Sequence, residues 1–335
     1  MKPLVLFALP PLHPDTAGYF GEEVDLRIAS DPSVATVIRE GDGAVAIVGR
    51  GGTKIDGEVY DALERLQIVV AGGSGADCFD VPAATERGIA VLNNPGRVVG
   101  VPEYVLTVIP LLSKRLFQMD RAMRRGDVWP PRDRSGREVS GKTLGVVGFG
   151  HLGREVARRA KAGWDLRVLA YDPIVDQAAF DDAGVERQTD LHTLLAESDF
   201  VTVHVPLMDA TRGLIGRAEL EAMKPEAIFV NASRGAVVDE QALIEVMQAG
   251  GIAAAAVDVW DPEPPSPDHP LFQLDNVFVT PHMAGVTAES RAAGAKQVAD
   301  TVLSALRGVQ PAHIVNPTAW PPARAQDHGF PLAAL

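Results

Sequence analysis

The 335-residue sequence contains one cysteine, Cys78, which excludes an internal disulfide framework. A lone thiol fits a reducing compartment, so a cytoplasmic location is expected. The sequence also lacks any apolar stretch near the roughly 18 residues that a membrane-spanning helix needs, so no membrane partner is expected. The N-terminal run MKPLVLFALPPLHP is broken by prolines and is not followed by a signal-peptide cleavage pattern. We expect this run to form a first strand.

Basic residues are scarce as well. Lys and Arg total 31 against 44 Asp and Glu, which gives a net charge of −13 at pH 7. A surface that binds nucleic acid must be basic, so no nucleic-acid partner is expected. An anionic small molecule is not excluded, because the local charges of a pocket decide what it binds. With 46% hydrophobic residues, the chain has an ordinary globular composition and enough length for two domains.

The segment 142–173 has the order of elements that a dinucleotide-binding unit requires. An apolar run leads into a G-x-G-x-x-G at 148–153, then a helical pattern, then a second apolar run that ends in Asp172. This acid comes about 20 residues after the last glycine, where it would accept hydrogen bonds from a ribose. Because a carboxylate repels a 2′-phosphate, NAD is favoured over NADP. FAD uses the same turn, and only later residues indicate nicotinamide.

Each position of this motif has a physical role. Gly148 allows the turn, Gly150 lets the backbone approach a pyrophosphate, and Gly153 lets the helix pack closely on the strand. The residues between them, His151 and Leu152, begin a helix whose N–H groups face the anion.

The first part of the chain alternates strands with helices, which predicts a parallel sheet covered on both faces. The expected strands are 4–8, 24–28, 44–48, 67–71 and 89–92. Two loops follow such strands, Gly49–Thr53 and Gly72–Asp77. Their small residues allow successive N–H groups to point at one anion, although a loop that binds nothing is the alternative.

The later part repeats the alternation. Together with the two strands of the glycine motif, the runs 200–204, 227–231, 253–259 and 277–280 predict six parallel strands. One long amphipathic helix is predicted from Pro102 to Arg125. Its apolar face could pack on its own domain or on a second subunit. A last helix, Ala288–Leu306, should return to the first domain. We therefore expect an α/β protein with two doubly wound sheets, a Rossmann domain (98–287) inserted into a flavodoxin-like domain (1–97 plus 288–335).

Three segments that follow later strands combine reactive residue types. They are Asn231–Gly235, Val257–Pro265 and Thr280–Gly285. Each residue alone has an ordinary structural explanation, such as a surface salt bridge or a turn. At the carboxyl ends of successive strands in a nucleotide domain, however, Arg234, Glu263 and His282 would form a chemically complete set.

In these motifs the chain resembles the D-isomer-specific 2-hydroxyacid dehydrogenase family, which includes D-3-phosphoglycerate, D-lactate and glyoxylate/hydroxypyruvate dehydrogenases. The matching segments are GSGADCFD (73–80), GKTLGVVGFGHLGREVARR (141–159), HVPLMDATRGLIG (204–216), NASRGAVVDEQAL (231–243), DVWDPEPP (258–265) and TPHMAG (280–285). The resemblance implies that Arg234 holds the substrate carboxylate and polarises the carbonyl. It implies that His282 gives the carbonyl oxygen a proton, with Glu263 as its hydrogen-bond partner.

The resemblance also implies binding residues, with NAD as the cofactor and no metal. The expected cofactor-binding residues are Gly148, Gly150, His151, Leu152, Gly153, Asp172, Pro173, His204, Val205, Pro206, Thr211, Ala232, Ser233, Arg234, Asp258, His282 and Gly285. The expected substrate-binding residues are Arg50, Gly73, Ser74, Gly75, Ala76, Arg234 and His282. Asp258 should bind the nicotinamide carboxamide, and Arg50 matches a position that in some members reaches a substrate phosphate.

The expected function is NAD-dependent reduction of a small 2-oxo acid such as hydroxypyruvate or glyoxylate, by a homodimer formed through the 102–125 helix region. Oxidation of D-3-phosphoglycerate is the alternative. The glycine loop lacks the lysine of phosphite dehydrogenases, so phosphite is disfavoured. A rival of another class is an NAD(H)-sensing corepressor, which would be expected to carry additional interaction segments.

Overall fold

The computed structural model describes residues 2–11, 13–96, 99–127 and 135–333. Contacts divide the chain into two compact units, the first from Met1–Arg97 and Val286–Leu335 and the second from Val98–Gly285. The predicted domain boundary at residues 97 and 98 lies outside the described residues. We refer to these parts as unit 1 and unit 2.

Unit 1 is built on a parallel sheet with the strand order β2-β1-β3-β4-β5. This order is that of flavodoxin-like folds. All five predicted apolar runs form strands. The strands are β1 (Leu4–Phe7), β2 (Asp25–Ile28), β3 (Ala44–Gly49), β4 (Ile68–Ala71) and β5 (Ala90–Leu92).

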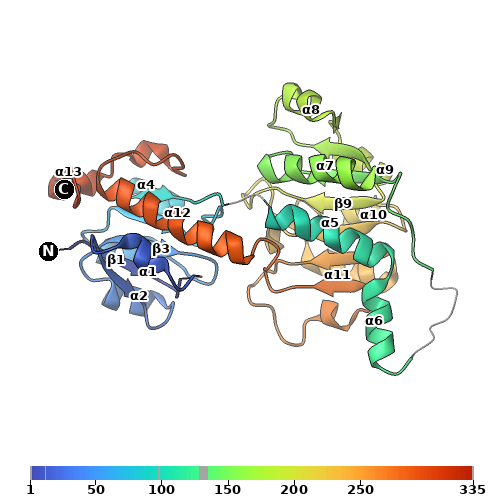
Figure 1. Ribbon diagram of the computed structural model, residues 1–335, viewed down its shortest axis with the longest axis horizontal. Coiled ribbons are helices and arrows are strands. Elements are labelled where there is room, and N and C mark those ends of the chain that lie inside the picture. Colours follow the sequence, from blue (N-terminus) through green and yellow to red (C-terminus); the bar gives the residue numbers. More distant parts are fainter. Residues whose placement is uncertain (1, 12, 97–98, 128–134, 334–335) are drawn as a thin grey trace. The chain divides into compact units, whose positions relative to one another are not determined.

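Helices cover both faces of this sheet. Apolar residues of α2, α3 and α4 join the core on one face, and those of α1 and α12 join the core on the other. The predicted last helix is present with its predicted bounds, and it packs in unit 1 (Figure 1). The helices of unit 1 are α1 (Thr16–Phe20), α2 (Val34–Glu40), α3 (Gly57–Ala62), α4 (Val81–Glu86), α12 (Ala288–Leu306), η3 (Pro317–Ala319) and α13 (Ala323–His328).

Unit 2 contains seven parallel strands in the order β12-β11-β10-β9-β6-β7-β8 within the described ranges. The prediction of six strands was wrong because β8 was missed. This edge strand has three residues, Glu-Arg-Gln, which are partly exposed and so carry no apolar signal. The strands are β6 (Thr143–Val147), β7 (Arg167–Tyr171), β8 (Glu186–Gln188), β9 (Phe200–Val203), β10 (Ile228–Asn231), β11 (Ala254–Val257) and β12 (Val277–Val279).

The helices of unit 2 form two layers. Apolar side chains of α5, α7 and α8 pack on one face of the sheet, and those of α9, α10 and α11 pack on the other. Figure 1 shows α5 and α7 side by side over the sheet, and contacts join these two helices. No helix among the described residues is long and apolar enough to cross a membrane. The helices are α5 (Gly100–Ser113), α6 (Leu116–Arg124), α7 (His151–Trp164), α8 (Gln177–Ala183), α9 (Leu191–Glu197), α10 (Arg217–Glu221), η1 (Gly235–Val237), α11 (Glu240–Ala249) and η2 (Pro270–Gln273).

The single helix predicted over 102–125 is in fact two helices, α5 and α6. The chain breaks at Arg115, which has φ +54° in the left-handed region. The N–H of Arg137 donates to the carbonyl oxygen of Ser113 at 2.7 Å, so an outside partner satisfies the end of α5. Leu116, the first residue of α6, is 53% exposed. The apolar spacing continued through the break, so sequence periodicity could not reveal it.

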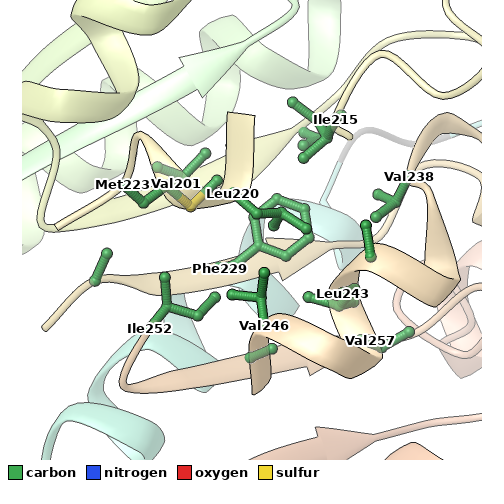
Figure 2. Close-up of a cluster of buried hydrophobic side chains, with 14 of the residues drawn as sticks. Val201, Ile215, Leu220, Met223, Phe229, Val238, Leu243, Val246, Ile252 and Val257 are labelled. Carbon is green, nitrogen blue, oxygen red and sulfur yellow. The ribbon is translucent and has the colours of Figure 1, made fainter. Parts of the chain in front are cut away.

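The core beside α11 anchors the strand that leads into the Arg234 loop. Figure 2 shows the ring of Phe229, on β10, enclosed by apolar side chains that include Leu220, Leu243 and Val246. Phe229 is completely buried. Burying a phenylalanine contributes about 2 kcal/mol or more, so the end of β10 is held firmly where the reactive loop begins.

Candidate active site

Three glycines shape the turn between β6 and α7, and each has its own reason to lack a side chain. Gly148 has φ +93°, and a Cβ there would lie 2.8 Å from the carbonyl carbon of His204. A Cβ on Gly153 would lie 2.1 Å from the carbonyl oxygen of Gly148. A Cβ on Gly150 would meet no described atom within 4 Å. The turn therefore fits the close approach of a pyrophosphate at Gly150.

The N-terminus of α7 adjoins this turn. Gly150 is the N-cap of the helix and has no side chain to satisfy the first N–H groups, which begin at His151. These groups and the dipole of a 14-residue helix favour an anion at this end. The residues present therefore fit a dinucleotide.

Asp172 follows β7 and ties the glycine turn to that strand. Its Oδ2 accepts the N–H of Phe149 at 2.8 Å, and its Oδ1 accepts those of Ile174 and Val175 at 2.9 and 3.1 Å. The side chain is half-buried, so a negative charge is held beside the turn. A carboxylate in this position suits ribose hydroxyls and opposes a 2′-phosphate.

The segment after β9 carries a neutral histidine. Nε2 of His204 lies 3.0 Å from Oγ1 of Thr202, and its buried Nδ1 has no hydrogen-bond partner among the described residues. Burial lowers the pKa of His204 to about 4. Thr211 closes the following turn by donating to the carbonyl oxygen of Pro206 at 2.6 Å.

Asn231, at the end of β10, folds the loop that carries Arg234. Its Oδ1 accepts the N–H and the hydroxyl of Ser233 at 3.1 and 2.8 Å, and its Nδ2 donates to the carbonyl oxygen of Arg234 at 3.0 Å. Nη1 of Arg234 donates to the carbonyl oxygen of Ser233 at 2.7 Å. These bonds fix the position of a half-buried guanidinium group.

The Arg234 loop packs directly on the loop that carries Glu263. A Cβ on Gly235 would lie 2.1 Å from the carbonyl carbon of Trp260, so only glycine fits there. The N–H of Trp260 donates to Oε1 of Glu263 at 3.1 Å, and its indole N–H donates to the carbonyl oxygen of Thr280 at 3.1 Å. Trp260 therefore joins the loops that follow β10, β11 and β12.

Glu263 and His282 form a hydrogen-bonded pair. Nδ1 of His282 lies 3.1 and 3.0 Å from the two carboxylate oxygens. Burial raises the pKa of Glu263. Opposing effects that are together stronger hold this pKa below its ordinary value: the hydrogen bond and charge of His282, the N–H of Trp260 and the charge of Arg234. Since Nδ1 faces Glu263, Nε2 is the nitrogen that can serve a substrate. The charges of both His282 and Arg234 act on the carboxylate of Glu263.

Asp258 follows β11 and ties down the loop that carries His282. It is 0% exposed, and its two oxygens accept the N–H groups of Met283 at 2.8 Å and Ala284 at 2.9 Å. Its carbonyl oxygen accepts the N–H of His282 at 2.7 Å. His282 has φ +57°, which non-glycine residues seldom adopt, and these bonds hold it there. The contact of Asp258 with a carboxamide stays a prediction.

The predicted cofactor and catalytic residues all lie in unit 2, after the carboxyl ends of six strands. They follow β6 (148–153), β7 (172–173), β9 (204–211), β10 (232–234), β11 (258 and 263) and β12 (282–285). Open α/β sheets bind their ligands at this edge.

The predicted substrate residues Arg50 and Gly73–Ala76 lie in unit 1, where their two loops are neighbours. The N–H of Gly72 donates to the carbonyl oxygen of Gly49 at 2.8 Å. Asn93 supports the second loop through a 2.7 Å bond from its Nδ2 to the carbonyl oxygen of Ser74. Nε of Arg50 is buried and lacks a partner among the described residues.

Sequence reasoning missed the residues that support this site. Asn231 carried a usable signal, because an amide directly after a buried strand suits a loop anchor. Trp260 and Tyr104 carried none. Tyr104 meets Thr280, 2.9 Å away, only because the fold joins α5 to the end of β12.

Comparison with known proteins gives a consistent picture. Residues 106–284 match the family model described as D-isomer specific 2-hydroxyacid dehydrogenase, NAD binding domain. A D-3-phosphoglycerate dehydrogenase from Archaeoglobus fulgidus is 42% identical over 88% of this chain and 55% of its own length. A glyoxylate reductase from Korarchaeum cryptofilum is 40% identical over 88% of this chain and 90% of its own. The chain spans about half the length of the first of these relatives, 55%, and nearly all of the second.

Solved structures show the same architecture. A protein from Thermus thermophilus is 32% identical with a TM-score of 0.83, covering 93% of this chain and 99% of that one. An NADPH-dependent glyoxylate/hydroxypyruvate reductase from Sinorhizobium meliloti is 26% identical with a TM-score of 0.84, covering 95% and 98%. The predicted fold class, two parallel-sheet α/β units, is confirmed.

Proposed function

Because the chain belongs to the D-isomer-specific 2-hydroxyacid dehydrogenase family, we propose that it is an NAD-dependent D-2-hydroxyacid dehydrogenase that reduces a small 2-oxo acid such as hydroxypyruvate or glyoxylate. The observation that carries the proposal is the pairing of His282 with Glu263 within reach of the charge of Arg234. Cation, acid and carboxylate are the groups that carbonyl reduction needs.

In the proposed reaction, Arg234 binds the planar carboxylate and polarises the adjacent carbonyl through its fork of N–H donors. Bound NADH supplies the hydride to the carbonyl carbon. Nε2 of His282 donates a proton to the carbonyl oxygen, and in the reverse direction it takes that proton from the hydroxyl. Glu263 stabilises the protonated imidazole. Because the oxygen gains negative charge in the transition state, Arg234 and His282 stabilise that state more than the ground state.

Oxidation of D-3-phosphoglycerate is a second candidate, favoured by one feature of unit 1. Burial and the nearby charge of Arg291 both lower the pKa of Arg50, so two cations lie close to each other. A substrate with a second anionic group would relieve their repulsion. A relative named D-3-phosphoglycerate dehydrogenase, 42% identical, is consistent with this candidate.

The proposed homodimer would form through α5 and α6. Helix α6 exposes two large apolar side chains, Leu116 at 53% and Met123 at 51%. Exposed apolar groups on one short helix suit a protein interface. Light scattering of the wild type and of Leu116→Glu tests this; a monomeric wild type would contradict the dimer.

The absorbance of NADH tests the proposed activity. Its decrease is followed with a panel of 2-oxo acids, and its increase is followed with D-3-phosphoglycerate plus NAD. Turnover of hydroxypyruvate or glyoxylate is expected. If D-3-phosphoglycerate is preferred and Arg50→Gln selectively removes that preference, the second candidate is correct. No turnover across the panel, with transcription factors recovered in a pull-down, would favour the corepressor.

A further inference from the structure

The hydroxyl of Tyr104 is joined to the His282 loop through two other side chains. It lies 2.9 Å from Oγ1 of Thr280, whose hydroxyl hydrogen-bonds to Oδ1 of Asp258. A carboxylate can only accept, so Thr280 gives its single proton to Asp258. Thr280 must then accept from the phenol. The phenol of Tyr104 therefore donates to Thr280, and Thr280 donates to Asp258.

Helix α5 touches the same loop at a second point. A Cβ on Gly100, one turn before Tyr104, would lie 3.1 Å from the carbonyl oxygen of Ala284 and 3.2 Å from Cα of Gly285. Burial raises the pKa of Tyr104 well above its ordinary value, so the phenol stays a donor. The first turn of α5 thus forms a fixed surface beneath the loop that follows β12.

The backbone at His282 requires such support. Its φ of +57° is costly for a residue with a side chain. The carbonyl oxygen of Asp258 accepts the N–H of His282, and its carboxylate accepts the next two N–H groups, those of Met283 and Ala284. The rotamer and position of this one buried carboxylate therefore set the path of the whole loop.

We propose that Tyr104 is a positioning residue for His282. Its hydroxyl orients Thr280 and Asp258, and these hold residues 282–284 in the conformation that presents the imidazole to Glu263. The inference rests on the proposed function, in which His282 is the acid and base. It adds a contribution from helix α5, which carries none of the predicted catalytic residues.

Tyr104→Phe tests the proposal because it deletes only the hydroxyl. We expect kcat for 2-oxo acid reduction to fall about fivefold to tenfold, the effect of one lost hydrogen bond, with the Kd of NADH unchanged. Tyr60→Phe in unit 1 is the matched control, since its hydroxyl is also buried and donates to the carbonyl oxygen of Ile55 at 2.9 Å. Equal kcat in Tyr104→Phe and wild type, or equal losses in both variants, would overturn the proposal.

Thr280 provides a second, independent test. Thr280→Ser keeps the hydroxyl and should retain most activity, whereas Thr280→Val should lose as much kcat as Tyr104→Phe. Because both residues act along one chain, the double variant Tyr104→Phe/Thr280→Val should lose little more than either single variant. Additive losses would show that the two hydroxyls act separately.

An NMR measurement separates this proposal from the proposed function. The imidazole Cε1–H resonance of His282, assigned by its absence in His282→Gln, should shift in Tyr104→Phe and not in Tyr60→Phe. This result does not depend on turnover. An inactive wild type would count against the proposed function alone, whereas an unmoved resonance in Tyr104→Phe would reject the positioning role.

Discussion

Nδ1 of His282 lies 3.1 Å from Oε1 and 3.0 Å from Oε2 of Glu263, so the imidazole ring faces both oxygens of the carboxylate. The carboxylate is itself held by the N–H of Trp260 at 3.1 Å. A histidine whose Nδ1 is fixed in this way has its tautomer and orientation set by its partner. The pair therefore determines which nitrogen can exchange a proton with a substrate.

Glu263→Gln should change the pH dependence of reduction. The pKa of Glu263 is held below its ordinary value, so the carboxylate is charged at neutral pH and favours the imidazolium. Without that charge, the imidazolium of His282 loses its stabilising partner. The fall in kcat that accompanies protonation of Glu263 in acid, below its lowered pKa, should also be absent from the pH profile of the variant. The decline in kcat near neutrality is expected to be about tenfold to a hundredfold.

The pH profile of kcat checks this expectation, with Glu219→Gln as the control. Glu219 pairs with His192 at 3.2 Å elsewhere in unit 2. A profile of Glu263→Gln that superimposes on that of the control would show that the carboxylate does not govern the histidine.

Gly150→Ala should weaken NADH binding without unfolding the protein. Gly150 has φ −69°, which alanine adopts, and the added methyl group would meet no described atom within 4 Å. It would, however, occupy the surface that a pyrophosphate approaches, so the Kd of NADH should rise about tenfold or more. Fluorescence titration measures this change. Gly163→Ala, equally uncrowded in the same helix, should bind as the wild type does; if Gly150→Ala does so too, the phosphate site is misassigned.

Asp172→Ser should reduce the preference for NADH over NADPH. Loss of the charge removes repulsion of a 2′-phosphate, and we expect the ratio of the two dissociation constants to move about tenfold or more toward NADPH. Asp176→Ser, an exposed acid in the same loop, is the control for a general charge effect. If the ratio of dissociation constants changes equally in the two variants, Asp172 has no specific role in cofactor choice.

His204 should make the protein less stable in mild acid. Its folded pKa of about 4 lies below the ordinary 6.5, so the unfolded chain binds more protons between these values and stability is lost as pH falls through that window. At about pH 5 the loss should be about 2 kcal/mol. Urea unfolding of the wild type and His204→Asn at neutral and acid pH measures it. An equal pH dependence in both proteins would contradict the assignment.

Sequence patterns predicted this fold well where apolar runs are long and bounded by glycine or proline. Apart from β8, the strands of both sheets lie on predicted runs, and helix α12 has its predicted bounds. The reactive side chains follow strand ends, which share one edge of a parallel sheet. Pattern reasoning failed at β8, whose residues are polar, and at Arg115, where apolar spacing runs through a break. In the site, the pairing of Glu263 with His282 was predictable because each follows a strand in the same sheet.

The residues that hold these side chains in place were not predictable, since their contacts join segments that are distant in the sequence. Tyr104 and Thr280 are 176 residues apart in the chain. The burial of His204 likewise reflects packing around β9, whereas its H-V-P motif suggested a cofactor contact. Local patterns show which residues follow a strand, but they do not show which distant side chains hold those residues in place.

The central claim is that His282 exchanges the proton during hydride transfer. The most direct test compares the wild type with His282→Gln in two measurements. These are the steady-state consumption of NADH with hydroxypyruvate and the Kd of NADH. We predict that kcat falls about a hundredfold to ten-thousandfold while the Kd of NADH stays within about twofold. Unchanged turnover, or equal losses in turnover and in NADH affinity, would contradict the claim.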